Sequence, residues 1–312
     1  MEPFRVHILG CGSATPTLKH NCSSQIVEVR GKCFMVDCGE GTQTQLRLSR
    51  IKFTRLSAVF ISHLHGDHCF GLIGLISTFG MLGRTAPLHI YAPAGFEPML
   101  NAMLEMFCQG LEYEVVFHGV DTTQNKDIYE DRSLTIETIP LSHRIACCGF
   151  LFREKPGNRH INREMVDFYH VPLSQLNNIR AGASWTTEEG DVIPNERLTF
   201  PADPVRSYAY CSDTRYMAQL YKLVENVTLL YHEATYASDS EDRARLYYHS
   251  TAAQAARVAR DAHVQTLMLG HFSSRYENEQ ILLAEAQAIF PCTILANEKL
   301  SVELKEHPNE PM

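Results

Sequence analysis

The 312-residue sequence predicts an α/β fold, in which strands and helices alternate along one chain. Short strand-like apolar runs recur from residue 4 to residue 304, and helical apolar periodicity recurs between many of them. A hydrophobic content of 45% and a charged content of 21% are those of an ordinary globular protein with a sizeable core. A chain of this length can form either one large domain or two small ones.

The composition also indicates in which compartment the protein works and which partners it can bind. No apolar run approaches the length of a membrane span, and the N-terminal residues lack the pattern of a signal peptide, so we expect a cytoplasmic protein. The ten cysteines form no C-x-x-C pair and fall mostly within strand-like runs, so we expect free thiols. The net charge of −8 argues against a non-specific polyanion binder.

The charge is unevenly spread along the chain. Residues 1–60 carry eight Lys and Arg against four Asp and Glu. A local basic surface of this kind is compatible with a partner that has a phosphate backbone.

The first part of the chain predicts four strands and a helix: strands over 4–9, 25–30, 32–37 and 56–61, and a helix over 42–50. The second and third strands form a hairpin at Gly31. The Gly10-Cys11-Gly12 turn resembles the start of a dinucleotide fingerprint, but Pro16 and polar residues stand where an apolar helix would have to begin. The signal for a dinucleotide site is therefore weak.

The stretch Ser62-His63-Leu64-His65-Gly66-Asp67-His68 follows the last of these strands and leads into an apolar helix. Three imidazoles and a carboxylate within six residues suit a borderline-soft divalent cation, above all zinc. His63 and His65 point the same way off an extended backbone, whereas Asp67 and His68 lie past the turn at Gly66. This geometry favours two adjacent metal ions, and its setting between strand and helix argues against a histidine-rich surface loop.

The middle of the chain predicts strands over 88–92, 113–118, 134–141 and 147–152, and a helix over 96–109. An apolar stripe on that helix, which includes Met99 and Phe107, has the spacing of a buried face.

Residues 155–203 break this pattern, because they are polar, contain several Gly and Pro, and are periodic only over 161–171. So long a polar stretch is either functional or mobile, although a solvated excursion with no task remains an alternative. We expect an inserted flexible arm whose first part is mildly basic. Beyond it the chain predicts strands over 206–211, 227–231, 265–269, 293–296 and 300–304, and helices over 217–224, 252–262 and 280–289.

Reactive side chains stand at equivalent places along these runs. Each of the following lies at a strand end or within two residues of one: His63, His143, Asp213, Glu233 and His271. Because reactive groups gather at strand ends in sheets of this kind, we expect these side chains to meet in one site.

These residues resemble the ribonuclease Z family, the tRNA 3′-processing endonucleases of the metallo-β-lactamase superfamily. The stretch from His63 to His68 indicates the superfamily, and three further motifs narrow it: His232-Glu233-Ala234-Thr235-Tyr236, His249-Ser250-Thr251 and His271-Phe272-Ser273-Ser274-Arg275-Tyr276. The resemblance covers essentially the whole chain. It implies an αββα sandwich, with two mixed sheets packed face to face and helices outside, as a single domain over 1–312 from which the arm over 155–203 protrudes as a tRNA exosite.

The resemblance also implies two zinc ions per subunit, with manganese or iron as substitutes. One ion would take His63, His65 and His143, the other would take Asp67, His68 and His271, and Asp213 would bridge them. Two dications that share a water lower its pKa toward neutrality, and they offset the charge of a phosphodiester under attack.

A proton donor for the leaving ribose oxygen completes the implied chemistry. His249 would be that donor with Glu233 as its carboxylate partner, while Asp67 would orient the hydroxide or accept its proton as well as bind metal. The helix start after His249 would lower its pKa and Glu233 would raise it. A purely structural hydrogen bond between the two remains an alternative.

The implied function is removal of the 3′ trailer from tRNA precursors by a zinc-dependent endoribonuclease, a homodimer in which one subunit's arm serves the other's site. Lys155, Arg159 and Arg163 are the candidate RNA-binding residues of the arm. One alternative is a dinuclear phosphodiesterase or lactonase that acts on a small molecule. Another is a non-catalytic protein that binds tRNA or metal, which would need a missing ligand.

Overall fold

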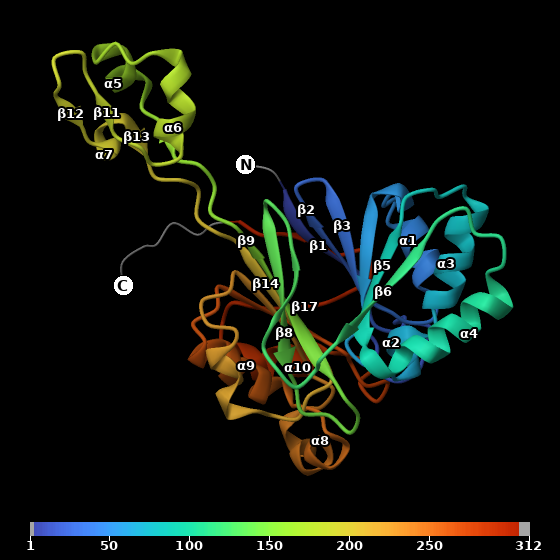
Figure 1. The fold of residues 1–312 in the computed structure, drawn as a ribbon. Helices are drawn as coiled ribbons and strands as arrows, with labels where there is room; N and C mark the ends of the chain where they lie inside the picture. The colour runs from blue at the N-terminus through green and yellow to red at the C-terminus, as the bar shows by residue number, and fades with distance from the viewer. Residues whose placement is uncertain (1–2, 306–312) are drawn as a thin grey trace.

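Two seven-stranded sheets packed face to face, with helices outside, form the body of the protein (Figure 1). This computed structural model describes residues 3–305. In spatial order the first sheet contains β18 (Ser301–Glu303), β1 (Phe4–Gly10), β2 (Ser24–Val29), β3 (Lys32–Cys38), β4 (Leu56–Phe60), β5 (Leu88–Pro93) and β6 (Val115–Val120). The second contains β17 (Thr293–Leu295), β16 (Thr266–Gly270), β15 (Leu229–Glu233), β14 (Ser207–Cys211), β9 (Cys148–Glu154), β8 (Leu134–Pro140) and β7 (Asp127–Glu130). The predicted αββα sandwich is confirmed.

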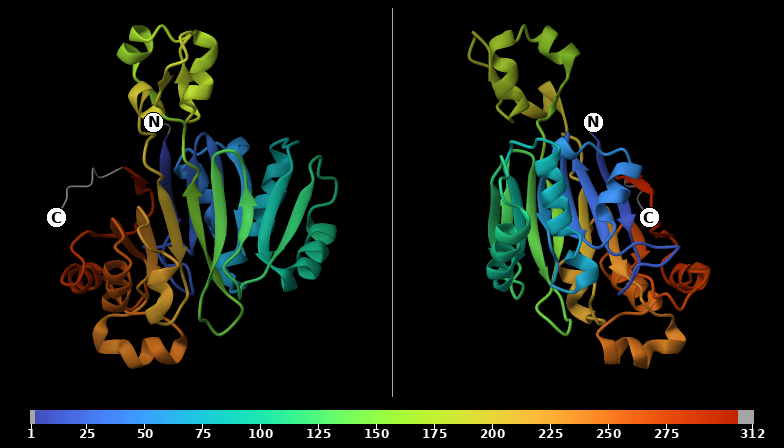
Figure 2. Two further views of the ribbon diagram at one scale, coloured as in Figure 1. Left: turned by 60° about the vertical axis from the view of Figure 1, so that its left-hand side comes forward. Right: turned by 90° about the vertical axis from the view of Figure 1, so that its right-hand side faces the viewer.

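Helices cover the outer face of each sheet (Figures 1 and 2). The first sheet is covered by α1 (Thr42–Leu48), α3 (Leu72–Met81) and α4 (Glu97–Phe107), and the second by α9 (Ala252–Asp261) and α10 (Gln280–Gln287). The shorter helices of the body are α2 (Gly66–Cys69), α8 (Glu241–Tyr247) and the 3₁₀ turns η1 (Phe53–Arg55), η2 (Ala94–Phe96), η4 (Ala218–Lys222) and η5 (Ser238–Ser240). Among residues 3–305, no helix has the length and apolarity needed to cross a bilayer.

Strand residues alternate between two cores because successive side chains point to opposite faces of a sheet. On β3, Phe34 and Val36 lie in the core between the sheets, whereas Met35 packs in the second core beneath the helices. Helix α9 begins as its sequence predicts: the Thr251 hydroxyl accepts from the Gln254 amide and the Gln254 side chain accepts from the Thr251 amide. All ten cysteines are free thiols, as expected.

The predicted buried stripe on α4 is wrong in part. Met99 and Phe107 are each 62% exposed, and Leu100 is the residue of this helix that is fully buried. The helix lies on the outside of the sandwich, so only one narrow side of it meets α3 (Figure 1). Two further elements, β7 and α8, were not predicted.

The basic surface expected over residues 1–60 is largely neutralised, although Glu2 lies outside the described residues. Five of its eight cations form ion pairs with acids that are mostly remote in sequence: Arg5 with Glu303, Lys19 with Glu279, Arg30 with Glu154, Lys32 with Asp131, and Arg55 with Glu28. The charge count of a segment therefore overstated its free positive charge.

The segment 155–203 forms a small folded module that protrudes from the sandwich and is joined to it by two extended connections (Figures 1 and 2). Its elements are β10 (His160–Ile161), α5 (Arg163–Phe168), η3 (Leu173–Gln175), α6 (Leu176–Arg180), β11 (Trp185–Thr186), β12 (Val192–Ile193), α7 (Asn195–Leu198) and β13 (Thr199–Phe200). They enclose a core of their own, made of Val166, Val171, Ile179, Ile193 and Leu198. The prediction of a single periodic piece is wrong, because most of these elements are too short to show a period.

Candidate metal centre and catalytic site

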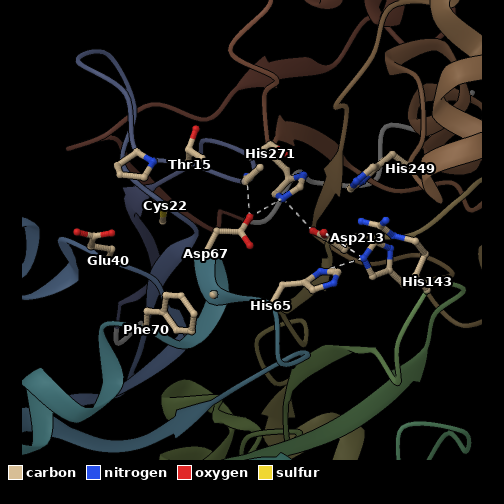
Figure 3. A pocket seen from close by; sticks show the side chains of 15 residues that line it. Thr15, Cys22, Glu40, His65, Asp67, Phe70, His143, Asp213, His249 and His271 are labelled. Carbon is tan, nitrogen blue, oxygen red and sulfur yellow. Dashed lines mark hydrogen bonds and ion pairs between the residues drawn. The ribbon is translucent and has the colours of Figure 1, made fainter.

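Strand ends bring the candidate residues together at one edge of the sandwich. Strands β14, β15 and β16 run parallel, so their carboxyl ends meet and place Asp213, Glu233 and His271 side by side. The first sheet contributes the residues after β4 and on α2, and His143 comes from the turn between β8 and β9. Figure 3 shows side chains from both sheets converging on Asp213.

The backbone is bent where these side chains leave their strands. Asp213 has φ of 58° and His271 has φ of 57°, which is the left-handed region that non-glycine residues rarely adopt. Each such residue costs on the order of 1–3 kcal/mol, and this strain persists where the surrounding structure holds it. The bend turns both side chains toward the same point.

One group of donors surrounds Oδ2 of Asp213. Nε2 of His63 and Nε2 of His143 lie 3.6 and 3.7 Å from this oxygen. Nδ1 of His65 lies 3.0 Å from the first of these nitrogens and 3.2 Å from the second. We call His63, His65 and His143 the three-histidine group.

A second group surrounds the other oxygen of the same carboxylate. Nε2 of His68 and Nε2 of His271 lie 3.3 and 3.0 Å from Oδ1 of Asp213. They lie 3.5 and 3.6 Å from Oδ2 of Asp67, whose Oδ2 also accepts a hydrogen bond from the amide of Ala14 at 2.7 Å. We call Asp67, His68 and His271 the aspartate–histidine group.

The chemistry of these donors fits two cations. Within each group, one ligand atom per residue lies within 4.8 Å of all the others. Burial lowers the pKa of His63 well below its ordinary value and lowers that of His65 and His143 too, so these rings are neutral, which is the form that binds metal. Asp213 is 2% exposed, and among the described residues no Lys or Arg pairs with it. The groups therefore could hold metal ions.

Four of the rings are oriented through their other nitrogen. Nδ1 of His63 hydrogen-bonds with Ser62 Oγ at 3.0 Å, and Nδ1 of His68 hydrogen-bonds with Asp37 Oδ2 at 2.7 Å. Nδ1 of His143 hydrogen-bonds with the Tyr248 carbonyl at 3.1 Å, and Nδ1 of His271 hydrogen-bonds with Thr235 Oγ1 at 2.9 Å. A ring whose Nδ1 donates a hydrogen bond in this way presents its Nε2 to the candidate metal groups.

Asp37 and Thr235 are functional candidates that the sequence reasoning did not single out. Asp37 ends a buried strand, as Asp213 does, so the rule of strand-end residues would have found it. Thr235 lies within one of the quoted motifs, but nothing in the sequence shows that its hydroxyl links His271 to Glu233.

His249 and Glu233 form a hydrogen-bonded pair beside both groups. Nδ1 of His249 lies 2.9 Å from Oε1 of Glu233, which is fully buried and also accepts from the Thr214 amide. Burial acts to lower the pKa of His249, but the carboxylate outweighs it and raises this pKa to about 9. His249 also lies within ligand distance of Asp213 and His271.

An open cleft of about 430 Å³ is lined by His65 and His143 of the three-histidine group, Asp67 and His271 of the aspartate–histidine group, and Asp213. His143 and His249 lie on one side of it, and Glu40 and Phe70 lie on the other (Figure 3). The candidate RNA-binding residues Lys155, Arg159 and Arg163 do not lie in this cleft, because they belong to the arm and its stalk at the opposite end of the sandwich (Figures 1 and 2). Lys155 pairs with Glu130 and Arg163 with Asp167, so their charges are partly compensated.

The sequence is similar over nearly its whole length to proteins named ribonuclease Z. The protein from Bacteroides fragilis is 60% identical over 304 residues, which are 97% of this chain and 100% of that protein. The protein from Porphyromonas gingivalis is 48% identical over the same shares.

Solved structures give the same picture. Human tRNase Z, short form, matches with a TM-score of 0.71 and 26% identity over 97% of this chain and 100% of the human one. The metallo-beta-lactamase fold protein YhfI from Bacillus subtilis, 18% identical with a TM-score of 0.67 over 96% of this chain and 99% of its own, shares the fold. Residues 4–162 match the family model described as Anti-Pycsar protein Apyc1, a match that ends before Asp213.

Proposed function

This chain belongs to the ribonuclease Z family and is an endoribonuclease, and from that premise we propose that it removes the 3′ trailer from tRNA precursors with two zinc ions. One observation carries the proposal: the two oxygens of the buried Asp213 carboxylate face two separate groups of metal-binding side chains. A single-metal or non-catalytic protein has no need of both groups.

Each group would hold one ion and share Asp213 as the bridge. Imidazole nitrogens with few carboxylates suit zinc, and manganese or iron would also be accepted. When bound, two such ions supply a hydroxide near neutral pH and offset the charge of the phosphodiester. Asp67 has the further task of orienting that nucleophile or taking its proton, since the Ala14 amide fixes its carboxylate at the cleft.

His249 would protonate the leaving ribose oxygen. Its Nδ1–H donates a hydrogen bond of 2.9 Å to Glu233. The other proton of the ring, on Nε2, is therefore available to the substrate in the cleft. A pKa raised to about 9 keeps the ring protonated at neutral pH. Glu233 is thereby a positioning residue that also sustains the charge of the acid.

The arm is proposed as an exosite that grips tRNA for the site of a second subunit. Strand β9 begins near His143 at the metal edge and ends at the stalk, and β14 runs back from the stalk toward Asp213. Seven extended residues span about 20 Å, and the module projects farther still from the cleft of its own chain (Figure 2). This separation supports a homodimer in which the arm acts on the partner's substrate.

Charge alone does not explain how the arm would hold RNA. Residues 155–203 contain five Lys and Arg against seven Asp and Glu, so only the first part of the segment is basic. The module does expose large apolar side chains, among them Phe168, Leu173 and Val192. Exposed apolar side chains of this kind would contact a partner, and Lys155, Arg159 and Arg163 would add charged contacts.

Mapping of reaction products tests the function. The purified protein is incubated with a 3′-extended tRNA precursor, with and without a chelator, and the product ends are sequenced. We expect one cut at the 3′ side of the tRNA that the chelator abolishes. Cleavage scattered along the RNA, or cleavage that persists in chelator, would contradict the proposal. Cytoplasmic location, where such precursors are made, is part of the same proposal.

Mixing of two defective variants tests the dimer. His65→Ala disables the site but leaves the arm, whereas deletion of 155–203 removes the arm but leaves the site. If the arm acts in trans, the mixture regains cleavage that neither variant shows alone. If each arm serves its own chain, the mixture stays inactive.

A further inference from the structure

A second hollow, of about 520 Å³, shares His249 with the catalytic cleft. Its lining includes Ser142, Arg215, Tyr216, Arg245 and Gln254, and we call it the Arg215 pocket. His249 lines both the cleft and this pocket. A ligand that contacts His249 in the cleft can therefore extend into the pocket. Neither the sequence motifs nor the proposed mechanism uses it.

Arg215 is held in place by the segments that carry the metal-binding residues. Its Nε donates to Ser142 Oγ at 2.8 Å, and its amide donates to the Ser142 carbonyl at 3.0 Å. Its guanidinium lies 5.0 Å from the centre of the Tyr248 ring. Ser142 precedes His143, and Arg215 follows Asp213 by two positions. The guanidinium is therefore fixed relative to the site of reaction.

The charge of Arg215 is not neutralised by any acid among residues 3–305. In the part of the chain that the structure describes, no carboxylate lies within ion-pair distance of Arg215, and its hydrogen bonds to protein use Nε and the amide. Its two terminal nitrogens thus have free donors, in the planar fork that matches a phosphate. A fixed Arg that has no acidic partner in the described structure, beside a phosphodiester-cleaving centre, points to a phosphate ligand.

The rest of the pocket agrees with a nucleotide as the occupant. Glu241 is the carboxylate among its described lining residues, and it accepts from Nε2 of Gln254. Arg245 adds a second cation, although its charge is shared with Asp242. The pocket therefore carries net positive charge in a protein whose net charge is −8, and Tyr216 supplies an aromatic surface against which a base can pack.

We propose that the Arg215 pocket binds the nucleotide whose ribose oxygen leaves, with Arg215 contacting the next backbone phosphate on that side of the cut. The inference rests on the proposed function, because it takes His249 as the acid. The leaving ribose must lie against Nε2 of His249, and the strand that continues from this ribose passes His249 into the pocket. Arg215 would fix which phosphodiester lies over the metal groups.

Salt-dependent kinetics test the subsite. For a 3′-extended tRNA precursor, kcat/KM is measured at several KCl concentrations for the wild type, Arg215→Ala and Arg215→Lys, and zinc content is measured in each. We expect Arg215→Ala to lose roughly 10- to 100-fold in kcat/KM, the value of a hydrogen bond to a charged group. The slope of log kcat/KM against log salt should become shallower by about 0.7, the value of one phosphate contact on a single strand.

The controls separate binding from structure. Arg215→Lys keeps the charge but not the fork, so it should restore the salt slope and only part of the rate. Arg243→Ala removes a similar guanidinium, also stacked on a tyrosine, that lies on α8 outside the pocket, and it should match the wild type. Zinc content should be unchanged in all variants.

Each outcome bears on a distinct claim. If the wild type does not cut the precursor, the proposed function fails. If the wild type cuts and Arg215→Ala keeps its rate or its salt slope, the subsite is wrong. If Arg215→Ala loses zinc and the slope is unchanged, Arg215 only supports the segments at Ser142 and Asp213, and the proposal is overturned.

Discussion

Replacement of Asp37 by Asn would show whether buried neighbours set the position of the protons on the candidate metal-binding histidines. Asp37 is fully buried at the end of β3. Its Oδ2 accepts from Nδ1 of His68 at 2.7 Å, from the Tyr210 hydroxyl at 2.7 Å and from Ser62 Oγ at 2.9 Å, and its Oδ1 accepts from the Ser62 amide at 2.8 Å. A carboxylate group that accepts from all of these partners fixes a His68 proton on Nδ1 and directs Nε2 toward Asp213 and His271.

The amide of Asp37→Asn cannot satisfy these partners in either orientation. With its NH₂ toward His68, Nδ1 must accept, and the proton moves to Nε2, which faces Asp213 and His271 at 3.3 and 3.4 Å. With the NH₂ toward Ser62, two donors face each other. Loss of such a supporting bond lowers metal affinity roughly 10- to 100-fold. The charge-assisted bond to His68 also contributes about 1.5–3 kcal/mol to the free energy of unfolding.

Zinc titration of the metal-stripped protein against a competing chelator measures the effect. For Asp37→Asn we expect one of two binding steps to weaken by that factor, with precursor cleavage falling in parallel. Tyr210→Phe is the matched control, because it removes a donor to the same Oδ2 but keeps the carboxylate; both steps should stay near wild type. Two unchanged steps in Asp37→Asn would refute the argument that this carboxylate fixes the His68 proton.

Three other perturbations have defined outcomes. Glu233→Gln should shift the alkaline limb of the pH–rate profile to lower pH, because His249, as the proposed acid, would work only below its pKa, which the carboxylate raises; an unmoved limb would assign the proton to another group. Deletion of 155–203 should abolish precursor cleavage but spare hydrolysis of bis(p-nitrophenyl) phosphate, and equal loss of both would argue against an exosite. Glu154→Gln should lower the free energy of unfolding in urea by about 1.5–3 kcal/mol, since it replaces the buried charge-assisted hydrogen bonds to Arg206 with weaker neutral ones; a loss below about 0.5 kcal/mol would contradict this.

Much of the candidate site was predictable because its residues follow strands directly. Asp213 and His271 each come within two residues of a buried strand, and parallel strands must bring such residues to one edge. The orientation of the rings was not predictable in this way. Asp37 and His68 are 31 positions apart, and Tyr210 joins them from the other sheet, so only the packing of both sheets reveals the contact.

The wrong predictions have a common physical cause. Each depends on which residues lie nearby in the fold, and the local sequence does not show them. Lys32 looks like a free cation until the second sheet places Asp131 beside it. Met99 has the spacing of a core residue, but α4 lies on the outside of the sandwich and this side chain is exposed. Arg215 was overlooked for the converse reason: nothing near it in sequence shows that it lacks an acidic partner within residues 3–305.

The most direct test of the central claim is a stoichiometric titration of activity. Metal-stripped protein receives zinc in known steps, and cleavage of a 3′-extended tRNA precursor is measured after each. If Asp213 bridges two ions that act together, activity saturates at two equivalents per chain, and Asp213→Asn abolishes it. Full activity before any zinc is added, or saturation at one equivalent, would contradict the account.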